Sequence, residues 1–105
     1  MNIAILGGGA WGTALAITLA GRHGVKLWAR DPEQRAAMRR ARCNARYLPD
    51  FAFPSALTVA DDPALALDGS HLAILGVTVA GLRSALKLVA AAAVPVPVIW
   101  LCKGF

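Results

Sequence analysis

The 105-residue sequence has few charged residues, only two cysteines and no apolar run of membrane-spanning length. Charged residues make up 16% of the chain and hydrophobic residues 57%, and this balance excludes a disordered chain. Cys43 and Cys102 have neither metal-ligand spacing nor a disulfide pattern, so we expect idle thiols in a reducing cytoplasm. The longest uncharged run of the second half, residues 88–102, contains two prolines and falls short of the ~20 residues of a membrane helix. We therefore expect one compact cytoplasmic domain with no membrane span.

Basic residues are concentrated in one stretch of a chain whose net charge is +5. This stretch has no interleaved aromatics and no nucleic-acid motif, so we do not expect nucleic acid as a partner. Most of its arginines are expected on the solvated face of a helix, with one or two serving a phosphorylated ligand. The arginines are Arg30, Arg35, Arg39, Arg40, Arg42 and Arg46.

A glycine-rich turn near the start carries the most specific signal. The apolar run 2–6 is followed by Gly-Gly-Gly-Ala-Trp-Gly at 7–12 and then by a helix-like stretch, which is the dinucleotide-binding fingerprint in its proper context. Gly7 permits a tight turn, Gly9 lacks the Cβ that would block a pyrophosphate, and Gly12 lets the helix pack close to the strand. The first-turn N–H groups and the positive end of the helix dipole would then face the phosphates.

The rest of the chain alternates strand and helix, which predicts an α/β fold. We expect a Rossmann-like doubly wound parallel sheet with strand order 3-2-1-4-5. His23-Gly24 is expected to close the first helix with a left-handed glycine, and residues 44–54 to form an irregular connection. The expected strands are 2–6, 25–29, 57–60, 71–77 and 97–101, and the expected helices are 11–22, 32–42, 63–67 and 81–92.

Four turns of this sheet would meet at the carboxyl ends of the strands, where ligands bind in such folds. They are the glycine turn and residues 29–31, 77–78 and 102–104. At the second turn, the neutral Ala29 followed by Arg30 favours a 2′-phosphate, so we expect NADP or NAD, with NADPH favoured. Asp31 is open to two roles, since it can reach the ribose or cap the helix that starts at Pro32.

Three other side chains are open to more than one interpretation. Trp11 could cover the pyrophosphate, plug the base of the cleft or pack in the core. Lys103 could be a solvated end residue, or could hold an anionic substrate or polarise a hydroxyl. His71 opens an apolar strand and could be structural or catalytic, and we expect a structural role.

The residues at 7–16, GGGAWGTALA, resemble the opening of bacterial NAD(P)-dependent glycerol-3-phosphate dehydrogenases. The segment 27–31, Asn44 with Tyr47-Leu48-Pro49, and Lys103-Gly104 are similar to that family in order and spacing, so the resemblance covers essentially the whole chain. Two positions depart from the pattern. Ala10 stands where serine is frequent, and Val77-Thr78-Val79 replaces a Val-Pro-Ser-like turn.

The resemblance implies reversible hydride transfer between dihydroxyacetone phosphate and sn-glycerol 3-phosphate, feeding phospholipid synthesis. It implies that Trp11, Arg30 and Tyr47 contact the dinucleotide, that Ala10 contributes backbone donors, and that Lys103 touches both cofactor and substrate. Because family members are much longer, residues 1–105 would be the N-terminal dinucleotide-binding domain. A helical substrate domain with the catalytic residue would lie elsewhere, and a homodimer would form only in the full-length protein.

Two alternatives stay open. One is another ketoacid or hydroxyacid reductase, such as a ketopantoate reductase, against which the WGTALA stretch argues. The other is a non-catalytic dinucleotide-sensing module like those that gate ion transporters. Such a module gives no reason for Tyr47-Leu48-Pro49 or for Lys103-Gly104.

Overall fold

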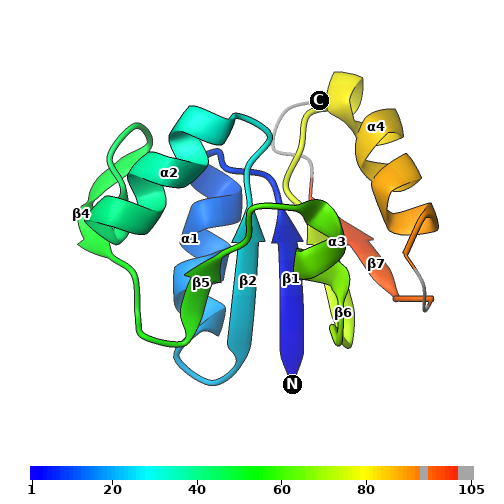
Figure 1. Cartoon of the computed structure of the whole chain (residues 1–105), viewed down its shortest axis with the longest axis horizontal. Helices are drawn as coiled ribbons and strands as arrows, with labels where there is room; N and C mark the ends of the chain where they lie inside the picture. Colours follow the sequence, from blue (N-terminus) through cyan, green and yellow to red (C-terminus); the bar gives the residue numbers. More distant parts are fainter. Residues whose placement is uncertain (93–94, 102–105) are drawn as a thin grey trace.

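A five-stranded parallel sheet forms the centre of the computed structural model, which describes residues 1–92 and 95–101 (Figure 1). Its strands run in the order β5-β2-β1-β6-β7. The predicted Rossmann-like class is confirmed. The predicted order of 3-2-1-4-5 reads differently because two short strands, β3 and β4, lie outside this sheet and shift the numbering. The five strands are β1 (Asn2–Leu6), β2 (Gly24–Trp28), β5 (Leu57–Val59), β6 (Leu72–Leu75) and β7 (Val98–Trp100).

In the described residues, four helices cover the two faces of the sheet: α1 (Ala10–Leu19), α2 (Pro32–Ala41), α3 (Pro63–Leu67) and α4 (Val79–Ala90). Both α2 and α3 begin with an aspartate as N-cap and a proline as the first helical residue. The Asp31 carboxylate accepts a hydrogen bond from the Glu33 N–H at 2.9 Å, and that of Asp62 accepts one from the Ala64 N–H at 2.7 Å. Both caps satisfy first-turn N–H groups, so the capping role predicted for Asp31 is confirmed.

The predicted end of the first helix is wrong. α1 ends at Leu19, and Gly24 is not left-handed but opens β2, where it pairs with Asn2 of β1. Pairing in a parallel ladder requires extended backbone, so the sheet rather than a helix cap decides the conformation of this glycine.

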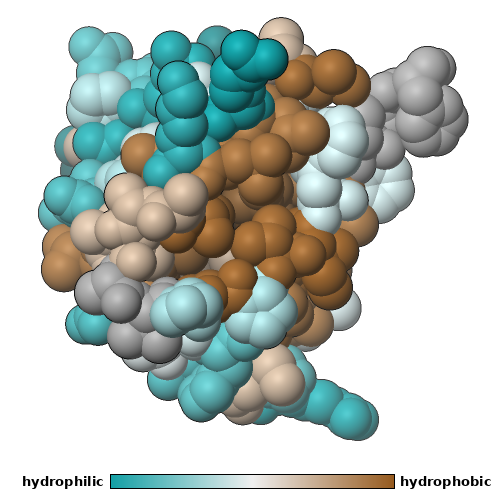
Figure 2. Space-filling view, turned by 90° about the vertical axis from the view of Figure 1, so that its right-hand side faces the viewer, coloured by the Kyte–Doolittle hydropathy of each residue, from teal (hydrophilic) through white to brown (hydrophobic). Residues whose placement is uncertain are grey.

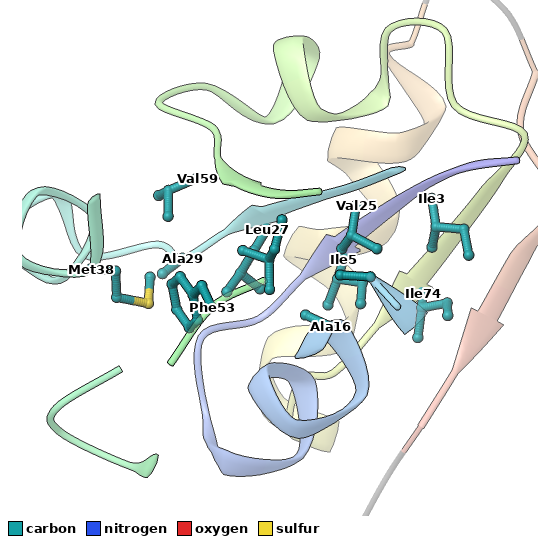
Figure 3. Packing of buried hydrophobic residues seen from close by; sticks show 12 residues of the cluster. Ile3, Ile5, Ala16, Val25, Leu27, Ala29, Met38, Phe53, Val59 and Ile74 are labelled. Atoms are coloured by element: carbon teal, nitrogen blue, oxygen red, sulfur yellow. The ribbon is translucent and has the colours of Figure 1, made fainter. Parts of the chain in front are cut away.

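Each face of the sheet has its own apolar core, as expected for a parallel sheet covered on both sides. Ile3 and Ile5 of β1 point to the face that carries α1 and α2, whereas Ala4 and Leu6 point to the face with α3 and α4. The first core is drawn in Figure 3, where Ala16 of α1 lies beside Ile5. The apolar run of β1 is thus explained by burial on both faces.

The segment predicted as an irregular connection is instead an antiparallel hairpin. β3 (Cys43–Asn44) pairs with β4 (Leu48–Ala52), with a shift of register between the two β3 residues. Most of β4 is exposed, so it lacks the alternation by which a strand is recognised in a sequence. This hairpin packs beside α2 and brings the segment around residue 47 towards the glycine turn (Figure 1).

Apolar side chains gather on the face that carries α4 and β7 (Figure 2). The exposed large apolar residues there are Val79, Leu86, Val98, Ile99, Trp100 and Leu101. Within residues 1–92 and 95–101, none of the helices combines the length and the apolar character needed to cross a membrane.

Candidate functional site

A groove of about 650 Å³ lies at the carboxyl ends of the strands. Three of the four turns predicted to meet there do so, namely those after β1, β2 and β6. The fourth, residues 102–104 with Lys103, lies outside the described residues. The lining residues are Leu6, Gly7, Gly8, Gly9, Trp28, Arg30, Asp31, Gln34, Tyr47, Gly76, Val77, Thr78, Gly81, Ser84, Ala85 and Leu88.

Gly7 and Gly12 shape the turn between β1 and α1 as the sequence predicts. Gly7 has φ +137°, a conformation that favours glycine, and its N–H donates to the Trp28 carbonyl at 2.8 Å. A Cβ on Gly7 would overlap the Gly76 carbonyl oxygen, and a Cβ on Gly12 would overlap that of Gly7. Since all of these obstacles are backbone atoms, neither position accepts a side chain without moving the turn.

Gly9 differs from both, because a Cβ there would meet no atom of the described residues within 4 Å. It is the N-cap of α1, with φ −79° and ψ −175°, and no side chain in the part of the chain that the structure describes caps this helix. The first N–H groups of a helix have no partner inside the helix. The empty space at Gly9 therefore adjoins uncapped donors at the positive end of a helix dipole, which fits a pyrophosphate group.

The end of β2 forms the next wall of the groove. Arg30 is exposed and lines the groove, directly after the buried Ala29. Asp31 also lines it, but one carboxylate oxygen caps α2 and the other lies 3.8 Å from Nη1 of Arg46. This carboxylate therefore has two protein partners at the position where an acidic residue would meet a ribose.

Four of the six clustered arginines are exposed, as expected for a solvated face, whereas Arg35 and Arg42 are partly buried. Three of the six also donate to backbone carbonyls. Arg35 Nη1 donates to the carbonyls of Ala29, at 2.7 Å, and Arg30, at 3.0 Å. Arg39 Nη2 donates to the Val59 carbonyl at 2.7 Å, while its Nη1 pairs with Asp61 at 2.7 Å. The third, Arg42, donates through Nη2 to the Pro54 carbonyl at 2.9 Å. These side chains connect α2 and the residue after it to the segments around Ala29, Val59 and Pro54, whereas Arg30 lines the groove.

Not all of the other predicted site residues line the groove. Tyr47 lines the groove at the tip of the hairpin, but Ala10, Trp11 and Gly12 are not among the lining residues. Trp11 is 57% exposed, so the predictions that it packs in the core or plugs the cleft are wrong. His71 is structural as expected, since its Nδ1 accepts a hydrogen bond from the Asn2 N–H at 2.9 Å.

Two residues that sequence reasoning did not select for the site touch the glycine turn. Gln34 Nε2 and Asn44 Nδ2 both donate to the Gly8 carbonyl, at 2.7 and 2.8 Å. Asn44 stands in the segment that carries the family resemblance, which was the one available signal. Over the part of the chain that the structure describes, no group of three or more His, Cys, Asp or Glu is placed to hold a metal ion.

A doubly wound parallel sheet with a glycine turn at its carboxyl edge defines a dinucleotide-binding fold of the Rossmann type. The chain belongs to the family described as NAD-dependent glycerol-3-phosphate dehydrogenase N-terminus, whose model matches residues 2–105.

The names of curated relatives agree with this assignment to a family. The chain is 50% identical over 105 residues to a glycerol-3-phosphate dehydrogenase (NAD(P)+) of Variovorax paradoxus, covering 99% of this chain and 31% of the relative. It is 38% identical over 105 residues to the protein of the same name from Dechloromonas aromatica, covering 100% of this chain and 32% of the relative. The chain thus spans about a third of the length of the curated relatives it matches.

Solved structures give the same result. The crystal structure of glycerol-3-phosphate dehydrogenase from Coxiella burnetii matches with a TM-score of 0.91 at 31% identity, over 99% of this chain and 33% of that one. A probable 2-dehydropantoate 2-reductase from Bacillus subtilis matches with a TM-score of 0.76 at 20% identity, over 99% of this chain and 34% of that one. The second likeness is one of fold alone, so the family match favours the dehydrogenase over the ketopantoate reductase alternative.

Proposed function

We propose that this chain binds NAD(H) or NADP(H) as the N-terminal dinucleotide-binding domain, residues 1–105, of a glycerol-3-phosphate dehydrogenase. The observation that carries the proposal is the position of Gly9. It joins an uncapped helix N-terminus to open space in a groove at the carboxyl edge of the sheet. The family match supports the choice of enzyme.

The residues have separate roles in this proposal. Gly7 and Gly12 hold the turn tight, so that the first-turn N–H groups, including those of Ala10 and Trp11, can bind the pyrophosphate. Tyr47 at the rim and Arg30 beside β2 contact the rest of the dinucleotide, with Asp31 next to them. When bound, the nicotinamide supplies or accepts the hydride.

We propose a preference for NADPH on two grounds. Arg30 lines the groove at the end of β2, where a guanidinium can accommodate a 2′-phosphate. Asp31, the acidic group that would favour the ribose hydroxyls of NAD, is engaged by the Glu33 N–H and lies near Arg46. Repulsion of a 2′-phosphate by Asp31 is thereby weakened.

The reaction proposed for the whole enzyme is reversible hydride transfer between dihydroxyacetone phosphate and sn-glycerol 3-phosphate, for phospholipid synthesis in the cytoplasm. Lys103 is proposed to touch cofactor and substrate. The phosphate substrate and the catalytic residue would be held mainly by the segments that the longer relatives have in addition, and a homodimer is proposed for the full-length protein. What supports these points is the family resemblance.

Fluorescence titration with NADPH and NADH tests the proposal. Trp28 lines the groove, so bound dinucleotide should quench its emission. We expect saturable quenching by both ligands, tighter for NADPH, and weaker quenching in a Trp28→Phe variant that still binds by calorimetry. No turnover of dihydroxyacetone phosphate is expected from this chain alone. Absence of binding for both ligands would refute the proposed function.

A further inference from the structure

One backbone carbonyl in the glycine turn receives hydrogen bonds from two side-chain amides. Asn44 Nδ2 donates to the Gly8 oxygen at 2.8 Å, and Gln34 Nε2 donates to the same oxygen at 2.7 Å. The Asn44 amide donates in addition to the Thr13 hydroxyl at 2.8 Å. We call Gln34 and Asn44 the amide pair. They come from α2 and β3, two elements remote from the turn in the sequence.

This arrangement fixes the direction of a neighbouring N–H group. In a planar trans peptide the carbonyl and the N–H point in opposite directions. With its oxygen held by the amide pair, the Gly8–Gly9 peptide must direct the Gly9 N–H away from Gln34 and Asn44. Gly9 is the N-cap of α1 and borders the open space of the groove, so this N–H is a donor whose aim matters for an anion.

The hairpin holds Asn44 in place. Asn44 pairs with Leu48 across β3 and β4, and its carbonyl accepts from the Tyr47 N–H at 3.2 Å. Tyr47 in turn lines the groove. One hairpin therefore places an interior amide against the glycine turn and an aromatic ring on the rim of the same groove.

Keeping asparagine here has a cost. Its side chain is fully buried, and Oδ1 has no hydrogen-bond partner among the described residues. A buried polar atom without a partner is destabilising, and native structures hold few of them. An apolar residue of similar size would avoid that cost but could not donate to Gly8. The presence of asparagine despite this cost indicates that the glycine turn requires its N–H donor.

We infer that Asn44 and Gln34 are positioning residues that aim the Gly9 N–H at the pyrophosphate of the dinucleotide. This inference rests on the proposed function, because it concerns the same groove. The amide pair acts through the backbone of the turn, so its contribution is common to NADH and NADPH, which share the pyrophosphate. It is distinct from the contribution of Arg30, which acts at the 2′ position.

Two variants of the chain test it, Asn44→Leu and Gln34→Met, with Thr18→Val as matched control. Thr18 lies on the exposed side of α1, where its hydroxyl donates to the Ala14 carbonyl. For each variant, urea unfolding establishes that the protein is folded, and titrations give the Kd for NADH and NADPH. Titration with inorganic pyrophosphate, followed at the Gly9 amide resonance by NMR, reports on the aimed donor itself.

Loss of one well-aligned hydrogen bond to a charged group predicts that Asn44→Leu raises both Kd values about tenfold and by equal factors. The pyrophosphate-induced shift of the Gly9 amide should shrink with it. For Gln34→Met we expect a rise of about threefold, again equal for the two ligands, and for Thr18→Val no change.

The outcomes separate this inference from the proposed function. If the unchanged chain binds neither dinucleotide, both fail. If it binds them and a folded Asn44→Leu variant keeps its Kd within twofold, or loses affinity for only one ligand, the inference alone is overturned. Should Asn44→Leu not fold, Gln34→Met decides by the same criteria, because Gln34 lies on α2 near the surface and is only half-buried.

Discussion

Replacing Gly9 with alanine should separate binding from folding. The backbone at Gly9, with φ −79° and ψ −175°, is open to any residue, and the added Cβ would meet no atom within 4 Å in residues 1–92 and 95–101. Alanine restricts the unfolded chain, which stabilises by about 0.4–1 kcal/mol, whereas alanine is a poorer N-cap than glycine by a similar amount. We therefore expect the free energy of unfolding to stay within about 0.5 kcal/mol of its original value.

The same substitution should markedly weaken binding of the dinucleotide. The methyl group would occupy the open space beside the first-turn N–H groups of α1, and a phosphate could not approach them closely. A hydrogen bond to a charged group contributes about 1.5–3 kcal/mol, so losing one predicts a 10- to 100-fold rise in Kd, roughly. The rise should be the same for NADH and NADPH.

Fluorescence titration and urea unfolding of the same Gly9→Ala preparation measure the two quantities. Ser84→Ala is a suitable comparison, because Ser84 lines the same groove from α4, away from the turn. An unchanged Kd for Gly9→Ala would refute the proposal that the pyrophosphate lies beside Gly9. A large loss of stability would show that the turn has no room for a methyl group at this position.

Three further substitutions have expected outcomes. Gly12→Ala should lower the free energy of unfolding by about 1–3 kcal/mol in urea titration, because its Cβ would overlap the Gly7 carbonyl; wild-type stability would contradict this. Arg30→Ala should weaken binding of NADPH up to about tenfold and binding of NADH much less. Equal losses of affinity in calorimetry would show that Arg30 does not contact the 2′-phosphate. Asp62→Ala should cost about 1 kcal/mol of stability through loss of the α3 cap without altering the Kd for either dinucleotide; a changed Kd would show that α3 is coupled to the groove.

Local rules explain why much of the fold could be predicted from the sequence. The starts of α2 and α3 depend on an aspartate and the proline after it, and the turn at Gly7 depends on a φ that favours glycine. The convergence of the turns follows from the handedness of parallel connections. These features need no knowledge of distant contacts.

The features that were missed depend on such contacts. β3 has two residues, and β4 contains Pro49 and is mostly exposed, so neither shows a strand pattern. The burial of Asn44 arises only once the hairpin folds back on the glycine turn. The size of Trp11 predicts a place in the core, in the cleft or over the pyrophosphate, but on α1 its side chain is 57% exposed, which excludes the core.

We propose that the glycine turn at the carboxyl edge of the sheet binds the dinucleotide pyrophosphate. An NMR titration of the isotope-labelled chain with NADH tests it most directly. We expect saturable shifts at the amides of Gly8, Gly9 and Ala10, accompanied by shifts at Tyr47 and Thr78 around the groove. Shifts confined to the separate groove lined by Leu65, Asp68 and Ala92, or no shifts at all, would contradict it.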